Sequence, residues 1–274
     1  MPDQIKLSHL EQTVYFAALR QGFHVLDVER VEALTPISRG HASKLLAAMA
    51  HKGALYRVGR GRYVVIPSDV LYSRQTFVAD PFQIADELLR REGVTEYYVA
   101  YQSAALVYGA AHQLPQSLLV ALPWQRRPIA LVRAEIIFVQ VQRAKFFGSQ
   151  GIRYHDALLR ISDREKTLLD CLDRFDLSGG MEEVVHTIGA LLPEVDPNRL
   201  LAYTPAMQNQ ALVHRLGYIL AMLALEQTVP ATLLDGLADL VGPGTYPLDP
   251  HGPPGGPTHA RWRVRANIAP ALEG

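Results

Sequence analysis

Several features that define large protein classes are missing or scarce in this sequence. Its 274 residues include one cysteine, Cys171, which excludes an internal disulfide and a zinc finger built on cysteines. The longest uninterrupted apolar run, 218–225, falls far short of the roughly 20 residues that span a bilayer. The opening residues also lack the apolar stretch of a signal peptide. We therefore expect a cytoplasmic protein.

The sequence has no excess of charge of either sign, since 27 Lys and Arg balance 27 Asp and Glu. The charges are nevertheless unevenly spread. Between Glu32 and Asp69 there is no acidic residue. The same stretch holds the basic residues Arg39, Lys44, Lys52, Arg57, Arg60 and Arg62. A local basic run on a neutral chain predicts one surface that binds a polyanion.

Three short helices are predicted before residue 53. Ser8 and Glu11 have the spacing of a capping box, and apolar residues recur at helical spacing after them. Asp27 is the expected cap of a helix over 28–34, and Ser38 that of a helix over 39–51. Thr35, Pro36 and Ile37 form the turn between them, because a residue before proline is pushed out of the helical region.

Two strand-like runs, 55–58 and 62–66, flank Gly59, Arg60 and Gly61, whose glycines fit a tight hairpin. Three helices followed by a basic-tipped hairpin is the order of a winged helix-turn-helix, whose third helix enters the major groove of DNA. The predicted DNA-binding residues are Ser38, Arg39, Gly40, His41, Ser43, Lys44, Arg57, Arg60 and Arg62. His41 is either a base contact or an ordinary surface histidine. The alternative for the whole segment is a small helical domain with a solvated basic face.

Beyond residue 67 the pattern changes. A linker is predicted over 68–80, and Asp80 is expected to cap a helix over 81–92 that has proline at its first position. Short runs rich in Val and Ile, at 118–122, 129–132, 136–141 and 152–154, predict strands whose close spacing favours antiparallel pairing. From Ser162, read as the first residue of a second capping box, the chain is expected to be helical to about residue 241. A last strand is expected over 261–268.

A second basic stretch lies at 123–153. It contains Arg126, Arg127, Arg133, Arg143, Lys145 and Arg153, against Glu135 alone. Charged residues at a sheet edge discourage aggregation, which is one explanation of this strip. Contact with nucleic acid or a protein partner is the other, and the sequence leaves both open.

Enzyme chemistry is only hinted at. Phe147, Gly148 and Ser149 look like the start of a nucleotidyltransferase site, but the two carboxylates that hold its metal ions are missing, since Asp156 stands alone. Asp170, Asp173 and Asp176 are better explained as a solvated helix face, with Asp170 paired to Arg174, than as a metal site. Cys171 lies between leucines and is expected to be buried. We therefore predict no enzyme, no metal and no cofactor.

Several segments resemble AbiEi-type antitoxins. The closest is the helix that begins Ile161-Ser-Asp-Arg-Glu-Lys-Thr-Leu-Leu-Asp and is followed by Gly179-Gly-Met-Glu-Glu. The other segments are Thr95 to Gly109, Phe146-Phe-Gly148, Tyr246-Pro-Leu-Asp249, and Trp262 to Asn267. This resemblance implies a type IV antitoxin, which represses its own operon through inverted repeats and counteracts a nucleotidyltransferase-like toxin. In that family neutralisation need not involve a stable complex with the toxin.

The combined prediction is an α+β protein. Residues 1–67 form a winged helix-turn-helix, 68–80 a linker, and 81–274 a larger mixed α/β antitoxin domain with a small, mostly antiparallel sheet and helices. The change of composition at the linker predicts that the two parts fold separately. The expected partners are operator DNA and the cognate toxin, with no membrane. The alternatives are a winged-helix regulator whose C-terminal domain senses a ligand or protein, and a DNA enzyme that uses the strip at 123–153.

Overall fold

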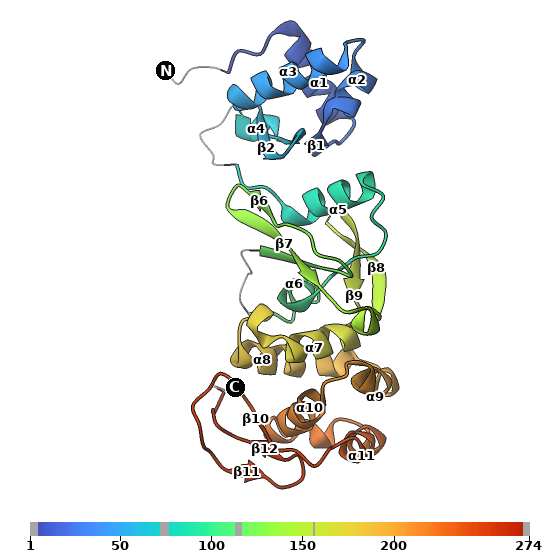
Figure 1. Cartoon of the computed structure of the whole chain (residues 1–274), viewed down its shortest axis with the longest axis vertical. Coiled ribbons are helices and arrows are strands. Elements are labelled where there is room, and N and C mark those ends of the chain that lie inside the picture. The colour runs from blue at the N-terminus through green and yellow to red at the C-terminus, as the bar shows by residue number, and fades with distance from the viewer. Residues whose placement is uncertain (1–4, 72–76, 113–116, 156, 271–274) are drawn as a thin grey trace.

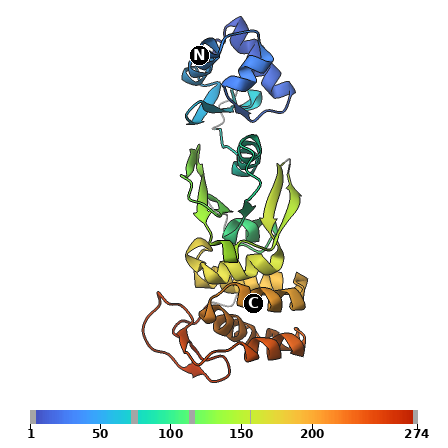
Figure 2. The ribbon, with the colours of Figure 1, turned by 45° about the vertical axis from the view of Figure 1, so that its right-hand side comes forward.

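The computed structural model describes residues 5–71, 77–112, 117–155 and 157–270. Along the longest axis it stacks a helical N-terminal unit, a six-stranded sheet and a C-terminal helical region, in chain order (Figure 1). The same order of layers is seen from a second direction (Figure 2). This is the α+β architecture that the sequence predicts. Asp156 and part of the predicted linker, 72–76, lie outside the described residues.

The N-terminal unit consists of three helices and a small antiparallel sheet. The helices are α1 (His9–Arg20), α2 (Val28–Leu34) and α3 (Arg39–His51). The strands are β1 (Val25–Leu26), β2 (Leu55–Gly59) and β3 (Arg62–Val65), in the order β1-β3-β2. This order of elements is consistent with the predicted winged helix-turn-helix.

The three helices begin where the sequence predicts. Ser8 and Glu11 form the capping box, in which a Glu11 carboxylate oxygen accepts from the Ser8 backbone N–H at 2.6 Å. Asp27 and Ser38 each accept a hydrogen bond from the backbone N–H three residues on. These bonds satisfy N–H groups that have no partner within the helix.

The small sheet of the N-terminal unit is apolar on both faces. Leu26 and Tyr63 point into the three-helix core. Val25 and Val64, their neighbours along the strands, are also buried, because they pack against Leu88 and other apolar residues of the next unit. Alternate residues of a strand face opposite sides of a sheet. The sheet is therefore enclosed between two layers, and the two predicted domains share one apolar cluster.

The helix α5 (Pro81–Arg91) forms the other side of that contact. A short helix, α4 (Ser68–Leu71), precedes it and occupies the start of the predicted linker. Asp80 caps α5 and proline is its first residue, as predicted. Most of the helix is buried, including Asp86 and Glu87. In Figure 2 α5 lies between the β6–β7 and β8–β9 strand pairs, with the N-terminal unit on its far side.

The central sheet has the order β6-β7-β5-β4-β9-β8. Its strands are β4 (Tyr98–Val99), β5 (Ser117–Leu122), β6 (Ile129–Leu131), β7 (Ala134–Gln140), β8 (Ser149–Tyr154) and β9 (Ala157–Ser162). Among the described residues β5–β7 and β4–β9 pair in parallel, and the other three pairings are antiparallel. The helix α6 (Tyr101–Val107) follows β4.

One predicted helix start is wrong. Ser162 is the last residue of β9, and Asp163 is the residue that caps α7 (Arg164–Asp173), because its carboxylate accepts from the Lys166 backbone N–H at 2.8 Å. The Ser162 hydroxyl is instead bonded to that of Thr167 at 2.7 Å. The prediction also missed β9, although its buried and exposed residues alternate.

The C-terminal region packs α7 against α8 (Met181–Leu191), α9 (Pro197–Ala206), α10 (Gln210–Met222) and α11 (Ala231–Asp239). Single-turn 3-10 helices occupy Arg143–Lys145, Phe175–Leu177, Leu192–Glu194 and Leu225–Gln227. The last strand is shorter than the predicted 261–268: β12 (Val264–Arg265) pairs with β10 (Tyr246–Pro247) and β11 (Thr258–His259). Within the described ranges, no helix is both long enough and apolar enough to cross a membrane.

Candidate nucleic-acid interface

The outer face of α3 carries most of the residues predicted to bind DNA. Ala42, Leu45, Leu46 and Met49 turn into the core of the N-terminal unit. The other face is open to solvent and holds Ser38, Arg39, Gly40, His41, Ser43 and Lys44. The Arg39 side chain is 73% exposed, and its one ion pair, with Glu32, is long at 3.9 Å. The guanidinium is therefore free to reach an external anion.

The hairpin between β2 and β3 carries the other three predicted residues, and we call its tip, Gly59–Arg62, the wing. Gly61 has a φ of +72°, the left-handed conformation that glycine adopts without strain. Arg57 and Arg60 are exposed. Arg57 donates to the Gly59 carbonyl at 3.2 Å. Arg60 forms no ion pair with any described residue, so it projects a free charge beside α3.

Arg62 is placed differently from the other predicted contacts. Its guanidinium forms an ion pair with the Glu92 carboxylate at 2.6 Å, and only 42% of its side chain is exposed. Glu92 follows α5 directly and is its C-terminal cap. No sequence pattern indicates this pair, because its partners are 30 residues apart and lie in different predicted domains.

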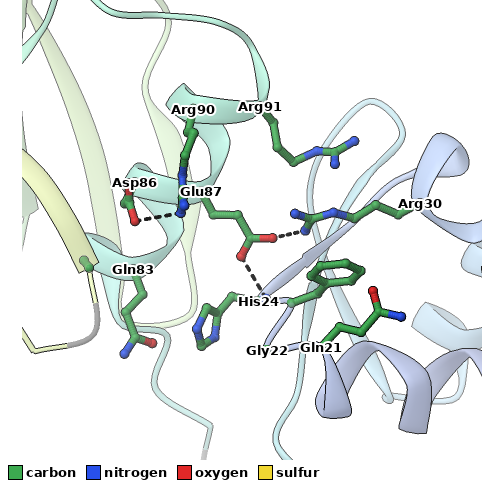
Figure 3. Close-up of a pocket in the computed structure, with 11 residues that line it drawn as sticks. Gln21, Gly22, His24, Arg30, Gln83, Asp86, Glu87, Arg90 and Arg91 are labelled. Atoms are coloured by element: carbon green, nitrogen blue, oxygen red, sulfur yellow. Dashed lines mark hydrogen bonds and ion pairs between the residues drawn. The ribbon is translucent and has the colours of Figure 1, made fainter. Parts of the chain in front are cut away.

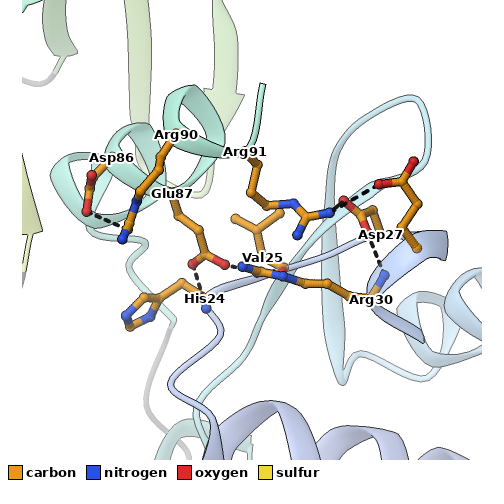
Figure 4. Close-up of polar contacts among 9 residues, drawn as sticks. His24, Val25, Asp27, Arg30, Asp86, Glu87, Arg90 and Arg91 are labelled. Carbon is orange, nitrogen blue, oxygen red and sulfur yellow. Dashed lines mark hydrogen bonds and ion pairs between the residues drawn. The ribbon is translucent and has the colours of Figure 1, made fainter. Parts of the chain in front are cut away.

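A groove of about 400 Å³ separates the N-terminal unit from the end of α5, and we call it the seam groove. Its basic lining residues are Arg39, Arg60, Arg62 and Arg91. Its acidic ones are Asp27, Glu29 and Glu92. Arg91 lies on α5 and pairs with Asp27, and it also lies 3.7 Å from Glu29 (Figure 4). The start of α3, the wing and the end of α5 therefore meet at one place.

A buried ion pair joins the two units beside the seam groove. Glu87 of α5 is 5% exposed and accepts from the His24 backbone N–H at 2.8 Å. Its other oxygen pairs with Arg30 (Figure 4). The Arg30 guanidinium also lies over the Phe23 ring. Burial lowers the pKa of Arg30 to about 10, with the nearby charge of Arg91 acting in the same direction. Arg30 is still a cation at neutral pH.

A second groove, of about 380 Å³, lies on the other side of this ion pair. Figure 3 shows Glu87 and Arg30 meeting across it, with His24 below them. Arg90 lines the same groove and pairs with Asp86 at 2.8 Å within α5. Charged side chains, most of them paired, thus line the grooves on both sides of the contact between the units.

Helix α7 buries polar residues that the sequence places in solvent. Asp170 is 3% exposed, and its pKa is raised by burial. It pairs with Lys166, which is fully buried and also donates to the Tyr98 hydroxyl at 3.3 Å. The predicted pair of Asp170 with Arg174 is wrong, since Arg174 binds Asp176 at 2.7 Å.

The segment Phe146-Phe-Gly148 packs against the same helix. A Cβ atom at Gly148 would lie 2.9 Å from Lys166 Cβ and 2.9 Å from the Tyr203 ring, so only glycine fits there. The Phe147 ring also lies beneath the Lys166 ammonium, 5.1 Å from the ring centre. Two of the segments that resemble the antitoxin family are therefore in contact.

Residues 97–222 match the family model described as the AbiEi antitoxin C-terminal domain. This region of the chain is therefore similar to the C-terminal domain of AbiEi antitoxins. The match begins one residue before β4, ends with α10, and includes both α7 and Gly148. The predicted resemblance is confirmed, and the family that it identifies is one of antitoxins, which in general have a toxin as their counterpart. Antitoxin domains of this family are in general not enzymes.

The fold of the whole chain is also found in a solved structure. The RV2827C protein from Mycobacterium tuberculosis superposes with a TM-score of 0.67 over 94% of this chain and 92% of its own. The two sequences are 13% identical, so the likeness is one of fold. No curated protein matches the chain in sequence.

The basic strip at 123–153 lies within the AbiEi domain, and half of its cations have acidic partners. Arg126 binds Glu92 at 2.6 Å, Arg143 binds Glu96 at 2.7 Å, and Lys145 binds Asp173 at 2.7 Å. Arg127, Arg133 and Arg153 are exposed. The sequence left the role of this basic strip open. For the three paired cations, ion pairs within the protein account for the positive charge.

Cys171 of the AbiEi domain is buried, as predicted, and burial raises the pKa of its thiol to about 12. A thiol in that state is a poor nucleophile. In the part of the chain that the structure describes, no three His, Cys, Asp or Glu side chains group in a way that holds a metal ion.

Proposed function

We propose that this protein is a DNA-binding antitoxin of a type IV toxin–antitoxin system. It represses its own operon and counteracts a nucleotidyltransferase-like toxin encoded beside it. It uses no cofactor. The observation that carries the proposal is the presence of both parts in one chain: an AbiEi domain over residues 97–222, and before it a winged unit with an exposed basic helix face.

The DNA-binding half of the proposal rests on the geometry of α3. In a winged helix-turn-helix the third helix lies in the major groove with its first residues nearest the base edges. Arg39 and Ser43 are one helical turn apart on the exposed face, so they are placed to read bases. Arg60 at the wing is placed to contact a phosphate or the minor groove.

Operator binding is tested with the full chain and the DNA upstream of its own gene. We expect preference for an inverted repeat in that region over random DNA of the same length. If about five phosphates are neutralised per protomer, log affinity falls with log salt concentration at a slope of about −4 to −5. Fluorescence anisotropy titrations between 50 and 300 mM KCl, roughly the range over which such contacts weaken, measure both quantities. Equal affinity for random DNA, or a flat salt response, contradicts the proposal.

The antitoxin half depends on the genetic neighbourhood. A neighbouring gene for a nucleotidyltransferase-like protein, whose toxicity this chain relieves, is the result that we expect. A chain that binds its operator but relieves no toxicity is a winged-helix regulator, and its C-terminal domain then senses a ligand or another protein.

A further inference from the structure

Two arginines of the wing, two residues apart, differ in what they contact. Arg60 is exposed and has no ion pair with a described residue, whereas Arg62 is bound to Glu92 at 2.6 Å. Both line the seam groove together with Arg39 of α3. The wing thus offers one free cation and one that a carboxylate of the protein already binds.

Glu92 is held in place independently of Arg62. Arg126, from the loop between β5 and β6, contacts both carboxylate oxygens of Glu92, at 2.6 and 3.2 Å. The Arg126 side chain is only 16% exposed, and it lies over the Phe138 ring at 4.4 Å. Such a two-point contact from a side chain that is itself packed fixes the carboxylate. Glu92 is therefore a rigid anion at the edge of the wing.

We propose that Glu92 withholds Arg62 from DNA, so that the second unit of the chain limits the affinity of the wing. This inference rests on the proposed function, because it takes operator DNA as the ligand of the wing. A phosphate that binds Arg62 must compete with a carboxylate that is already in place and has the same charge. Glu92 acts through Arg62 and is a positioning residue, not a DNA contact.

The same arrangement predicts an asymmetry between the two wing arginines. Loss of Arg60 removes a phosphate contact. Loss of Arg62 removes a side chain that Glu92 already holds away from an external phosphate, so wild-type affinity changes little. Once Glu92 is neutral, Arg62 becomes an additional phosphate contact. One contact steepens the salt slope by about 0.9, which corresponds to about fivefold in affinity near 0.15 M salt.

The test is a double-mutant cycle in the full chain, read by anisotropy with duplex DNA from the upstream region. Arg62→Ala is expected to change affinity less than about twofold, and Glu92→Gln to raise it about fivefold with a steeper slope. The double variant is expected to return to the wild-type value. Glu29→Gln is the matched control: Glu29 lines the same seam groove, carries the same charge and does not hold a wing arginine. Glu92→Ala serves as a second release variant, and circular dichroism melting checks that each variant is folded.

Three results overturn the inference. If Arg62→Ala weakens DNA binding as much as Arg60→Ala does, Arg62 already contacts DNA in the wild type. If Glu92→Gln raises DNA affinity by the same factor in the Arg62→Ala background as in the wild type, only the overall charge matters. The same conclusion follows if Glu29→Gln raises the affinity as much as Glu92→Gln does. No binding by any variant overturns the proposed function together with the inference, whereas wild-type binding that Glu92→Gln leaves unchanged overturns the inference alone.

Discussion

At the scale of single residues, Glu87 has the contacts that join the two units most closely. Its carboxylate is buried on α5, and both of its partners, Arg30 and the His24 N–H, belong to the N-terminal unit. Removing one member of a buried ion pair leaves the other charge without a partner, which costs roughly 3–5 kcal/mol. The charge of Glu87 is therefore more important for stability than those on the surface.

We expect Glu87→Gln to lower the free energy of unfolding by about 3 kcal/mol, measured from urea denaturation. The control is Asp176→Asn, because Asp176 and its partner Arg174 are both about half exposed. An exposed pair contributes less than about 1 kcal/mol. Equal losses for the two variants would show that the contact at Glu87 does not stabilise the fold.

At the scale of elements, α3 and the wing separate the proposed base contacts, the proposed phosphate contact and the core. Arg39→Ala and Ser43→Ala are each expected to reduce discrimination between operator and random DNA by roughly 1–3 kcal/mol, because each substitution removes a side chain that we propose to read a base. Arg60→Ala is expected to weaken binding to all sequences about evenly. Leu45→Ala, on the buried face, is expected to lower stability by about 2–5 kcal/mol.

Competition titrations with operator and random duplexes, combined with thermal melting, distinguish these three effects. Unchanged discrimination in both Arg39→Ala and Ser43→Ala would show that α3 does not lie in the major groove. A loss of discrimination in Arg60→Ala alone would move base recognition to the wing.

The elements of the N-terminal unit were predictable because their signals are local. Ser8, Asp27 and Ser38 are caps that act within three residues, and the structure has all three bonds. Ser162 and Asp163 are both competent caps in adjacent positions, so the choice between them depended on where β9 ends. Pairing with β4 and β8 determines where β9 ends, and the spacing of residues in the sequence carries no information on that pairing.

The candidate interface was predictable in part for the same reason. The exposed face of α3 follows from helical periodicity, so Arg39, Ser43 and Lys44 lie where expected. The partner of Arg62 does not follow, since Glu92 reaches it only after the units pack together. The burial of Asp170 was also missed, because the sequence offers Arg174 as a partner, whereas the fold places Lys166 beside it.

At the scale of the whole molecule, the contact between the units is a feature of the fold. Val25 and Val64 share an apolar cluster with Leu88. Ion pairs across the same contact include those of Arg30 with Glu87, Arg62 with Glu92 and Arg91 with Asp27. A cut near residue 80 would expose this cluster to water, which weighs against the expectation that the two parts fold separately. The boundaries 1–67, 68–80 and 81–274 remain predictions. Point variants of the full chain are therefore the appropriate means of separating the two activities.

In the proposed function one chain binds operator DNA and, through its AbiEi domain, relieves the toxicity of a neighbouring protein. The two activities have different requirements, because the predicted DNA contacts lie outside residues 97–222. An Arg39→Ala, Ser43→Ala double variant should therefore lose operator binding and retain the antitoxin activity. Placing the toxin gene under an unrelated inducible promoter removes repression as a route to protection.

The most direct measurement is growth of cells that express the neighbouring nucleotidyltransferase-like protein from that promoter, with and without this chain. We expect arrested growth with the toxin alone, and growth restored equally by the wild type and by the Arg39→Ala, Ser43→Ala variant. Failure of the wild type to restore growth would contradict the antitoxin claim. Restoration by the wild type but not by an equally abundant double variant would contradict the assignment of protection to the AbiEi domain.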